Sequence, residues 1–389
     1  MILHKINRLL LIGALAMVLS ACAGSKDLLR DPVPETLASQ SVVPGYPRIR
    51  YWGDDATDME AGALSQMAAQ QASRKLSEVS YLSVSGGGSN GAFGAGLLFG
   101  WTASRTRPEF TVVTGISTGS LIAPFAFLGP PYDENLKAAY TRISGKDIYE
   151  QKGLLEILGS ASAADNSPLR RLVATYVTDR MVSDIAREHA KGRRLLIGTT
   201  NLDAERPVVW DIGAIATSQG PNRRQLIQDV LVASASIPGV FPPVNIKVDA
   251  GGRYFDEMHV DGGTSNQAFL FPSNLSLKNT DKKLGLKRTR TLYVVRNGKV
   301  TPEYSAVRPK LASIAGKSIG SLIKTQGIGD LYRMYANARQ EGVDFNAIWI
   351  PPSFTVKETS PFDHGYMNQL FQMGYEMGRS GVRWNKRPP

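Results

Sequence analysis

Two β-prone runs that end in glycine and lead directly into helical segments constrain the fold of this chain more than any other feature. Residues 79–85 precede Gly86-Gly87-Gly88-Ser89-Asn90-Gly91 and a helical pattern over 91–104, and residues 110–114 precede Gly115-Ile116-Ser117-Thr118-Gly119 and a second helical pattern over 121–128. A strand followed at once by a helix is the repeating unit of a parallel sheet. The sequence therefore predicts the α/β class.

The same alternation continues along the chain. Further strands are predicted at 194–199, 208–212, 254–260, 292–295 and 347–350, and helices at 58–76, 225–236 and 361–378. Strands that alternate with helices favour a mainly parallel sheet covered on both faces. The segment 305–337 is also helical in pattern, and we expect it to form a cap or platform beside a cleft.

The composition excludes several classes of protein. The 389 residues include one cysteine and four scattered histidines, which cannot build an internal disulfide framework, a Cys-rich zinc site or a His-rich metal cluster. We therefore expect no metal. No stretch of about 18 apolar residues occurs, which excludes a membrane-spanning helix.

The N-terminus explains the cysteine. Lys5 and Arg8 precede an apolar run over 9–19, and Cys22 follows closely. Residues 1–21 therefore read as a signal peptide, and the end of this segment resembles a bacterial lipoprotein lipobox. The resemblance implies cleavage before Cys22, acylation of that residue and stable anchoring by its acyl chains. A soluble secreted protein is the alternative.

The lipobox resemblance also predicts a cellular location and the organisation of the N-terminal region. Ala23, rather than Asp, after the cysteine favours the outer membrane of a bacterial envelope under the lipoprotein sorting rule. We expect residues 22–76 to be a lipidated tether followed by a helix, because 23–50 is rich in Pro, Ser and charge.

The net charge of +11 fits contact with anionic lipid or nucleic acid. An envelope location favours lipid, and no nucleic-acid-binding module is present, so we expect no nucleic-acid partner. The basic run 278–290, with Asp281 as its one acid, is expected to be a solvated loop or a contact with anionic lipid.

The glycine motif from Gly86 to Gly91 is compatible with three structures. Successive N–H groups at the start of a helix bind either a dinucleotide pyrophosphate or an oxyanion. The motif also suits a turn for close packing. A dinucleotide site needs an acid at the end of the next strand, whereas here Glu109 precedes that strand.

Gly115, Ser117 and Gly119 form a GxSxG motif between a strand and a helix. Such a tight turn leaves no room for side chains at the two glycines and exposes the serine hydroxyl at the helix N-terminus. A third feature, Asp261-Gly262-Gly263, follows the strand 258–260. Alone, it is a plain Asp-Gly turn.

Together these motifs make the chain similar to the patatin-like phospholipases. The glycine motif resembles that family's oxyanion block, Gly115 to Gly119 its nucleophile elbow, 233–243 its third block and Asp261-Gly262-Gly263 its DG[AG] block, in the family's order over 79–274. The resemblance implies a three-layer α/β/α fold, with a catalytic domain at 77–275 and a region 276–389 that completes or caps it. Asn90 departs from the family, in which a basic residue is common.

The resemblance also implies a chemistry. Ser117 is the expected nucleophile, Asp261 the expected base of a Ser–Asp dyad, and backbone N–H groups near Gly87 and Gly88 the expected oxyanion donors. The expected substrates are membrane lipids, cleaved by phospholipase A, lysophospholipase or esterase chemistry, and no cofactor is required. An aspartate works as a base only in a site poor in water, because its ordinary pKa is about 3.9.

Two other functions stay open. In a Ser-His-Asp esterase, His364 would complete the order Ser, Asp, His. His259 lies on the same strand face as Asp261 and is expected to pack or hydrogen-bond near the site rather than act as the base. A non-catalytic envelope lipoprotein that uses the fold as a binding module is the second alternative.

Overall fold

The computed structural model describes residues 30–55, 57, 77–153, 156, 160–270 and 276–389. The predicted signal peptide, the acylation site at Cys22 and the helix expected at 58–76 lie outside the described residues. Within the described part of the chain, no helix has both the length and the apolar character needed to cross a bilayer.

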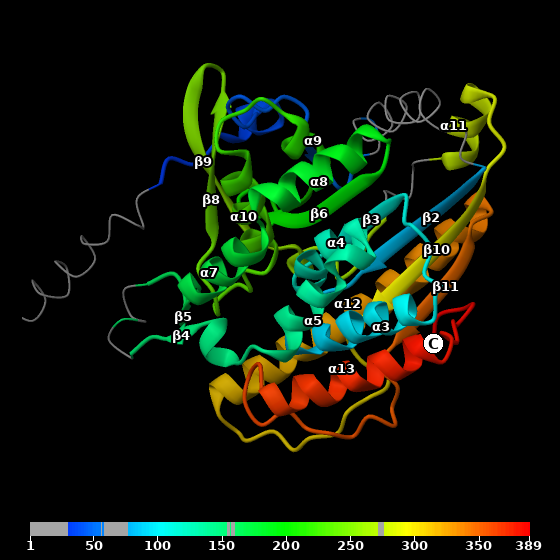
Figure 1. The fold of residues 1–389 in the computed structure, drawn as a ribbon. Coiled ribbons are helices and arrows are strands. Elements are labelled where there is room, and N and C mark those ends of the chain that lie inside the picture. The colour runs from blue at the N-terminus through cyan, green and yellow to red at the C-terminus, as the bar shows by residue number, and fades with distance from the viewer. Residues whose placement is uncertain (1–29, 56, 58–76, 154–155, 157–159, 271–275) are drawn as a thin grey trace, which may run out of the picture.

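A nine-stranded mixed sheet forms the centre of the molecule (Figure 1). Its main path runs β1-β7-β6-β3-β2-β10-β11, and the hairpin β8–β9 joins it through β6. The bounds are β1 (Arg50–Trp52), β2 (Glu78–Val84), β3 (Val112–Gly115), β6 (Arg194–Asn201), β7 (Arg206–Asp211), β8 (Val244–Ala250), β9 (Arg253–Asp261), β10 (Thr289–Arg296) and β11 (Asp344–Trp349). The neighbours β6, β3, β2, β10 and β11 are mutually parallel, whereas β1, β7 and β9 pair antiparallel. The prediction of a mainly parallel sheet is confirmed.

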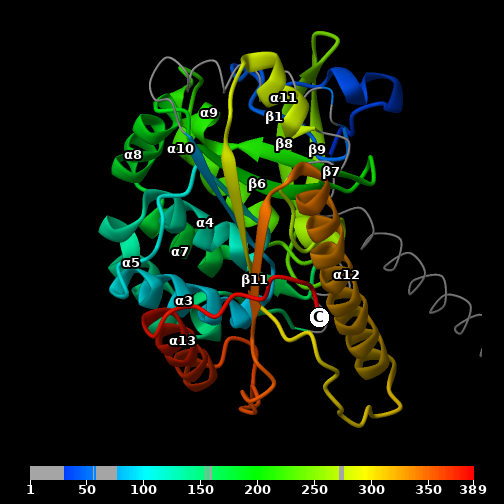
Figure 2. The ribbon, with the colours of Figure 1, turned by 90° about the vertical axis from the view of Figure 1, so that its right-hand side faces the viewer.

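Helices cover both faces of this sheet, which gives the three-layer α/β/α fold that was predicted (Figure 2). They are α3 (Gly91–Ala103), α4 (Thr118–Leu128), α5 (Asp133–Thr141), α7 (Ser167–Tyr176), α8 (Asp179–Ala190), α9 (Ile212–Thr217), α10 (Arg223–Ser234), α11 (Leu277–Leu284), α12 (Leu311–Glu341) and α13 (His364–Arg379). A small separate ladder joins β4 (Glu150–Gln151) to β5 (Ala164–Asp165).

Alternate residues of one strand show how the two hydrophobic layers arise. In β2, Leu82 joins the large core on the face of α3 and α4, whereas Tyr81 joins the core formed with Leu331 and Met334 of α12. Successive side chains of a strand point to opposite faces, so a strand buried on both faces is apolar almost throughout.

The C-terminal third completes the central sheet. β10 lies between β2 and β11, so the sheet continues across the boundary expected at residue 275. Helix α13 packs closely on α3, because a Cβ on Gly96 would lie 2.0 Å from the carbonyl oxygen of Phe371. The two chain segments that flank residue 275 therefore share one core.

The expectation of a tether over 23–50 is wrong for its described part. Val43, Tyr46 and Ile49 are buried in the main core, and Val42 exchanges backbone hydrogen bonds with Asp249. Arg50 opens β1, which pairs with β7. The prolines of this segment suggested an extended linker, but apolar residues between them attach it to the body.

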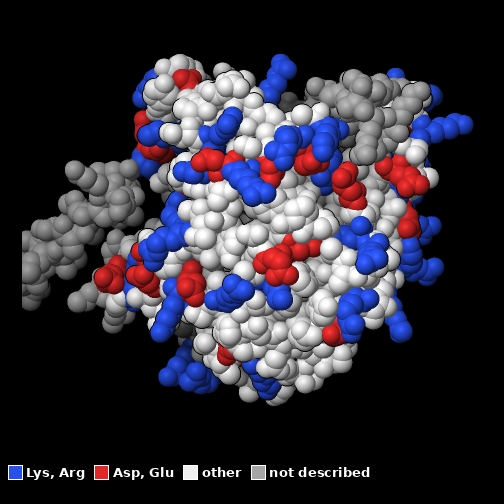
Figure 3. All heavy atoms as spheres, viewed as in Figure 1, with Lys and Arg blue, Asp and Glu red and all other residues white. Residues whose placement is uncertain are grey.

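The basic run 278–290 is also more structural than a solvated loop. Its first half lies in α11 and its last residue, Arg290, is in β10. The Arg290 guanidinium is buried against the Asp281 carboxylate, which it reaches through Nη2 at 2.6 Å, and against the Tyr81 hydroxyl at 3.2 Å. On the face drawn in Figure 3, basic side chains alternate with acidic ones over the surface.

Candidate active site

Ser117 and Asp261 are 144 positions apart in the chain. They lie close together at the end of the central sheet where the parallel strands β2 and β3 terminate. Ser117 follows β3 and begins α4, whereas Asp261 ends β9. β6 brings the two together, because the edge of β6 that β7 leaves free pairs with β3 over residues 194–197 and then, through Thr199, with Asp261 of β9. The Ser117 side chain hydrogen-bonds the Asp261 carboxylate.

The turn at Ser117 is strained. Its backbone angles are φ 54° and ψ −128°, a conformation that non-glycine residues rarely adopt. A Cβ on Gly115 would lie 2.4 Å from the Gly119 carbonyl oxygen, and one on Gly119 would lie 2.2 Å from that of Val84. The two glycines thus allow the tight turn that sets the serine at the start of α4.

Two serines of the segment 233–243 position this pair, a role that the sequence did not reveal. The Ser117 N–H donates to Ser234 Oγ at 3.1 Å, and that hydroxyl donates to the Gly198 carbonyl at 2.7 Å. The Asp261 N–H donates to the Ser236 carbonyl at 2.9 Å. The last residue of α10 and the turn that follows it therefore hold the backbones of both Ser117 and Asp261.

Burial makes Asp261 an unusual carboxyl group. The residue is 5% exposed, and this loss of solvation raises its pKa to about 6. Hydrogen bonds from Ser117 and from the Gly263 N–H, which reaches Oδ1 at 2.7 Å, act in the opposite direction. The group is thus ionised at neutral pH but is far more basic than an exposed aspartate.

The glycine loop lies against this pair. A Cβ on Gly86 would come within 3.2 Å of Ser117 Cβ, and one on Gly87 would lie 2.2 Å from the Asn297 carbonyl oxygen. Gly88 has φ 56°, which favours glycine. Among the described residues, the N–H groups of Gly87 and Gly88 have no hydrogen-bond acceptor. They are available to an anionic oxygen that develops near Ser117.

The remaining motif glycines allow close packing around the two loops. A Cβ on Gly91 would lie 2.1 Å from Thr118 Oγ1, so the starts of α3 and α4 touch. A Cβ on Gly262 would lie 2.4 Å from the Gly198 carbonyl oxygen, and one on Gly263 would lie 2.9 Å from Asp261 Oδ1. Each of these positions is therefore restricted to glycine for a local reason.

Asn90 hydrogen-bonds a neutral side chain. Its Oδ1 accepts a hydrogen bond from the Tyr366 hydroxyl at 2.5 Å, and the neighbouring Ser89 donates to the Glu358 carboxylate. The glycine loop thus carries an amide and a nearby carboxylate where a basic side chain is common in the family that the sequence resembles.

The two histidines considered as bases have other partners. His259 is fully buried between Thr199 Oγ1 and Glu257 Oε2, each at 3.0 Å, and burial lowers its pKa. His364 is exposed at the start of α13 and contacts the Thr141 carbonyl at 2.9 Å. In the described part of the chain, neither histidine hydrogen-bonds Ser117 or Asp261.

An apolar cavity begins one residue beyond Ser117. It is lined by Thr118, Leu121 and Phe125 of α4, by α5 and α7, and by Phe362. Its volume of about 60 Å³ is that of about two water molecules in the liquid. Phe362, at φ 59°, is held by hydrogen bonds from its N–H to Glu358 Oε1 at 2.8 Å and to Ser89 Oγ at 3.2 Å.

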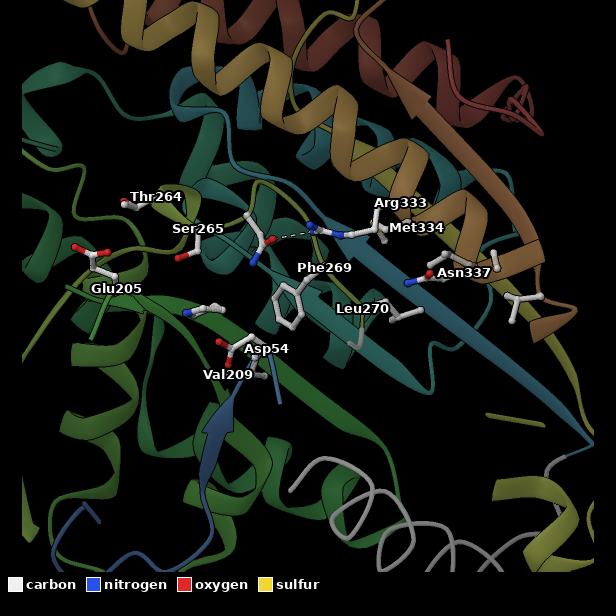
Figure 4. A pocket seen from close by; sticks show the side chains of 16 residues that line it. Asp54, Glu205, Val209, Thr264, Ser265, Phe269, Leu270, Arg333, Met334 and Asn337 are labelled. Carbon is white, nitrogen blue, oxygen red and sulfur yellow. Dashed lines mark hydrogen bonds between the residues drawn. The ribbon is translucent and has the colours of Figure 1, made fainter. Parts of the chain in front are cut away.

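A larger pocket of about 590 Å³ lies on the other side of the loop that follows Asp261. Figure 4 shows Ser265, Phe269 and Leu270 of that loop facing Arg333 and Met334 of α12. Ser117 and Asp261 are not part of its lining. The described residues include no cluster of three or more His, Cys, Asp or Glu side chains that suits a metal ion.

Comparison with known proteins gives one match to a family model, that of the patatin-like phospholipases, over residues 82–271. No curated protein sequence matches the chain. Among solved structures, VipD from Legionella pneumophila aligns with 10% identity and a TM-score of 0.41, over 78% of this chain and 66% of that one. Human GIVD cytosolic phospholipase A2 aligns with 11% identity and a TM-score of 0.32, over 78% and 55%. The chain thus spans less than two thirds of the length of these structures.

Proposed function

We propose that the chain is a lipid acyl hydrolase that works through a Ser117–Asp261 dyad, and the match of residues 82–271 to the family model of the patatin-like phospholipases supports this proposal. The observation that carries the proposal is the contact between the Ser117 hydroxyl and a buried carboxylate of raised pKa, next to glycine N–H groups that lack an acceptor among the described residues. Nucleophile, base and oxyanion donors are the three parts that acyl transfer requires.

The first half of the reaction transfers the acyl group to the protein. Asp261 takes the proton of Ser117 as Oγ attacks the ester carbonyl carbon. The negative charge moves to the carbonyl oxygen, where the N–H groups of Gly87 and Gly88 stabilise it; one such donor contributes about 3 kcal/mol. The ester C–O bond then breaks, and the proton held by Asp261 passes to the departing alkoxide.

The second half releases the fatty acid. Water enters in place of the departed alcohol or lysolipid, and Asp261 removes its proton as the oxygen attacks the acyl-Ser117 carbonyl. When the second tetrahedral intermediate collapses, the proton returns to Ser117 Oγ. The raised pKa of Asp261 serves both halves, because the same carboxylate accepts and returns a proton in each.

Labelling with a fluorophosphonate tests this proposal directly. The probe phosphonylates only an activated hydroxyl, so we expect covalent modification of Ser117, located by peptide mass spectrometry. His364→Ala should label at the wild-type rate, since His364 contacts Thr141 rather than the dyad. Loss of labelling in folded His364→Ala would instead favour a Ser-His-Asp esterase, and absence of labelling in the wild type would favour a binding module.

The apolar cavity next to Thr118 is the proposed entrance for the acyl chain, since its volume of about 60 Å³ holds only a few carbon atoms and a longer chain must widen it. Leu172 of α7 lines it, and a bulkier side chain there should exclude long chains before short ones. We expect Leu172→Trp to lower the ratio of kcat/KM for a long-chain ester to that for a short-chain ester about tenfold, since one methylene in such a pocket already changes discrimination by about tenfold or more.

Leu226→Trp is the matched control for this experiment. Leu226 is also partly buried against the main core, but it does not line the cavity. Its chain-length ratio should stay at the wild-type value. Equal changes in the two variants, each with a melting temperature near that of the wild type, would place the acyl chain elsewhere.

A further inference from the structure

The first half of α12 exposes a row of large apolar side chains. Leu311 is 87% exposed and Leu322 70%, and Ile314 and Ile319 are each about half exposed. The preceding loop adds Tyr304, which is almost fully exposed. Figure 2 shows this end of α12 at the lower right of the molecule, apart from the other labelled helices. Apolar side chains exposed together along one helix mark a contact surface.

Three of these side chains share one side of the helix. Since an α-helix turns about 100° per residue, Leu311, Ile314 and Leu322 fall within about 80° of one another. On the same geometry Lys317 and Lys324 lie within about 20° of each other on another side, and Lys310 immediately precedes the helix. Separation of apolar and basic side chains is typical of helices that lie in the surface of a membrane.

This segment is predominantly basic. Residues 299–329 contain five basic residues and one acid, Glu303. Glu303 pairs with Lys299 and Lys324. In the described part of the chain, Arg308, Lys310 and Lys317 have no carboxylate partner. A second copy of the same segment would bring like charges together, whereas an anionic surface complements them.

The second half of α12 connects this surface to the loop that follows Asp261. Gln326 donates to the Ser265 carbonyl at 2.7 Å, and Asp330 Oδ2 accepts from the N–H groups of Gln267 at 2.6 Å and Ala268 at 3.1 Å. The side chain of Gln267 in turn lies beside Gly86. The exposed half therefore has a fixed position relative to Ser117 and Asp261.

The topology places the exposed half of α12 on the side of the molecule where the parallel strands end and where Ser117 lies. The loop 297–310 leaves the carboxyl end of β10, and α12 returns from there toward the start of β11. Its first residues therefore lie at the edge where the parallel strands β2 and β3 end and where the glycine loop and Ser117 follow them.

We propose that residues 304–324 form an interfacial segment that lies on anionic phospholipid bilayers and turns the side of the molecule that carries Ser117 and Asp261 toward the membrane. This inference rests on the proposed lipid hydrolase function, because it assigns the surface from which the substrate enters. Tyr304, Leu311 and Leu322 enter the boundary between headgroups and acyl chains, while the basic side chains contact phosphate.

A single fluorophore placed on the helix tests the proposal. Cys22 is the only cysteine, so Leu322→Cys in a Cys22→Ser, Ser117→Ala full-length chain gives one labelling site without hydrolysis. With an environment-sensitive dye, we expect a severalfold rise in emission and a blue shift on vesicles that contain phosphatidylglycerol, and a smaller change on pure phosphatidylcholine. Tyr254→Cys, at a site 65% exposed on the β8–β9 hairpin, is the matched control and should not respond.

Equal responses at the two sites, or none at residue 322 on vesicles that carry the protein, would overturn the proposal. So would a blue-shifted dye at residue 322 without vesicles together with a dimeric mass, because a second copy would then cover the surface.

Turnover separates this inference from the proposed function. Leu311→Asp/Leu322→Asp should lower the ratio of vesicle phospholipid turnover to soluble short-chain ester turnover about tenfold, the loss expected when buried apolar side chains become charged. An unchanged ratio in an active enzyme would overturn the interfacial segment alone. A wild-type protein that cleaves neither substrate, yet shows the fluorescence response, would overturn only the hydrolase.

Discussion

Alanine in place of Ser117 is expected to lower kcat for ester hydrolysis by about 10⁴-fold or more, the loss typical of removing a catalytic nucleophile. Without Oγ no acyl intermediate forms, and the buried Asp261 alone offers only a weak route through direct attack by water. Turnover of a soluble short-chain ester and of vesicle phospholipid should fall together. The measurement is kcat on each substrate with purified full-length protein.

Ser120→Ala provides the matched control. Ser120 lies one turn further along α4, is also buried, and donates from Oγ to the Ser117 carbonyl at 2.6 Å. Its loss removes one hydrogen bond, worth about 1 kcal/mol, and we expect a fall of at most about tenfold. If Ser117→Ala retains activity comparable to that of Ser120→Ala, Ser117 is not the nucleophile.

The parts of the fold and site that sequence predicts well are those encoded over short distances. The strand at 79–85 and the turn Gly115 to Gly119 follow from apolar runs, glycines and their order, and the structure has β2, β3 and α4 there. A tight strand–turn–helix leaves its signature within a few residues, because the backbone itself requires glycine at fixed offsets.

Contacts between distant segments leave no such signature. Nothing in the local pattern indicates that Ser234 accepts from the Ser117 N–H, or that Asp330 of α12 holds the backbone of Gln267. A buried serine or aspartate looks the same in sequence whether its partner is catalytic or structural. The sheet register, which brings Thr199 opposite Asp261, decides these partners.

The N-terminal segment and α12 show a second limit. Tyr46 follows a stretch rich in proline and polar residues, yet its ring packs against Gly220 and its hydroxyl donates to the Pro221 carbonyl. The helix expected at 305–337 begins at Leu311 and ends at Glu341. Its periodicity predicts a helix, but its two halves have different surroundings, and only the tertiary structure shows which half is covered.

Asparagine in place of Asp261 is expected to lower kcat by about 10⁴-fold, because an amide cannot accept the proton of Ser117. The amide keeps the size of the side chain, and its oxygen can still accept from the Gly263 N–H.

In the wild type, kcat/KM should rise as the pH increases through about 6, where Asp261 loses its proton. A pH profile flat between pH 5 and 8, or an active Asp261→Asn protein, would exclude Asp261 as the base.

The same substitution should stabilise the folded protein at neutral pH. Because the pKa of Asp261 is about 6 in the folded state and about 3.9 when unfolded, the folded state binds more protons between these values. Stability from this group is therefore present at low pH and is lost as the pH rises toward 6 and beyond, by up to about 3 kcal/mol. The substituted amide does not titrate, so Asp261→Asn should exceed the wild type in free energy of unfolding at pH 7.5, and the difference should shrink toward pH 4. Denaturant unfolding at both pH values measures it, and parallel curves for the two proteins would show that burial of this carboxylate costs the fold nothing.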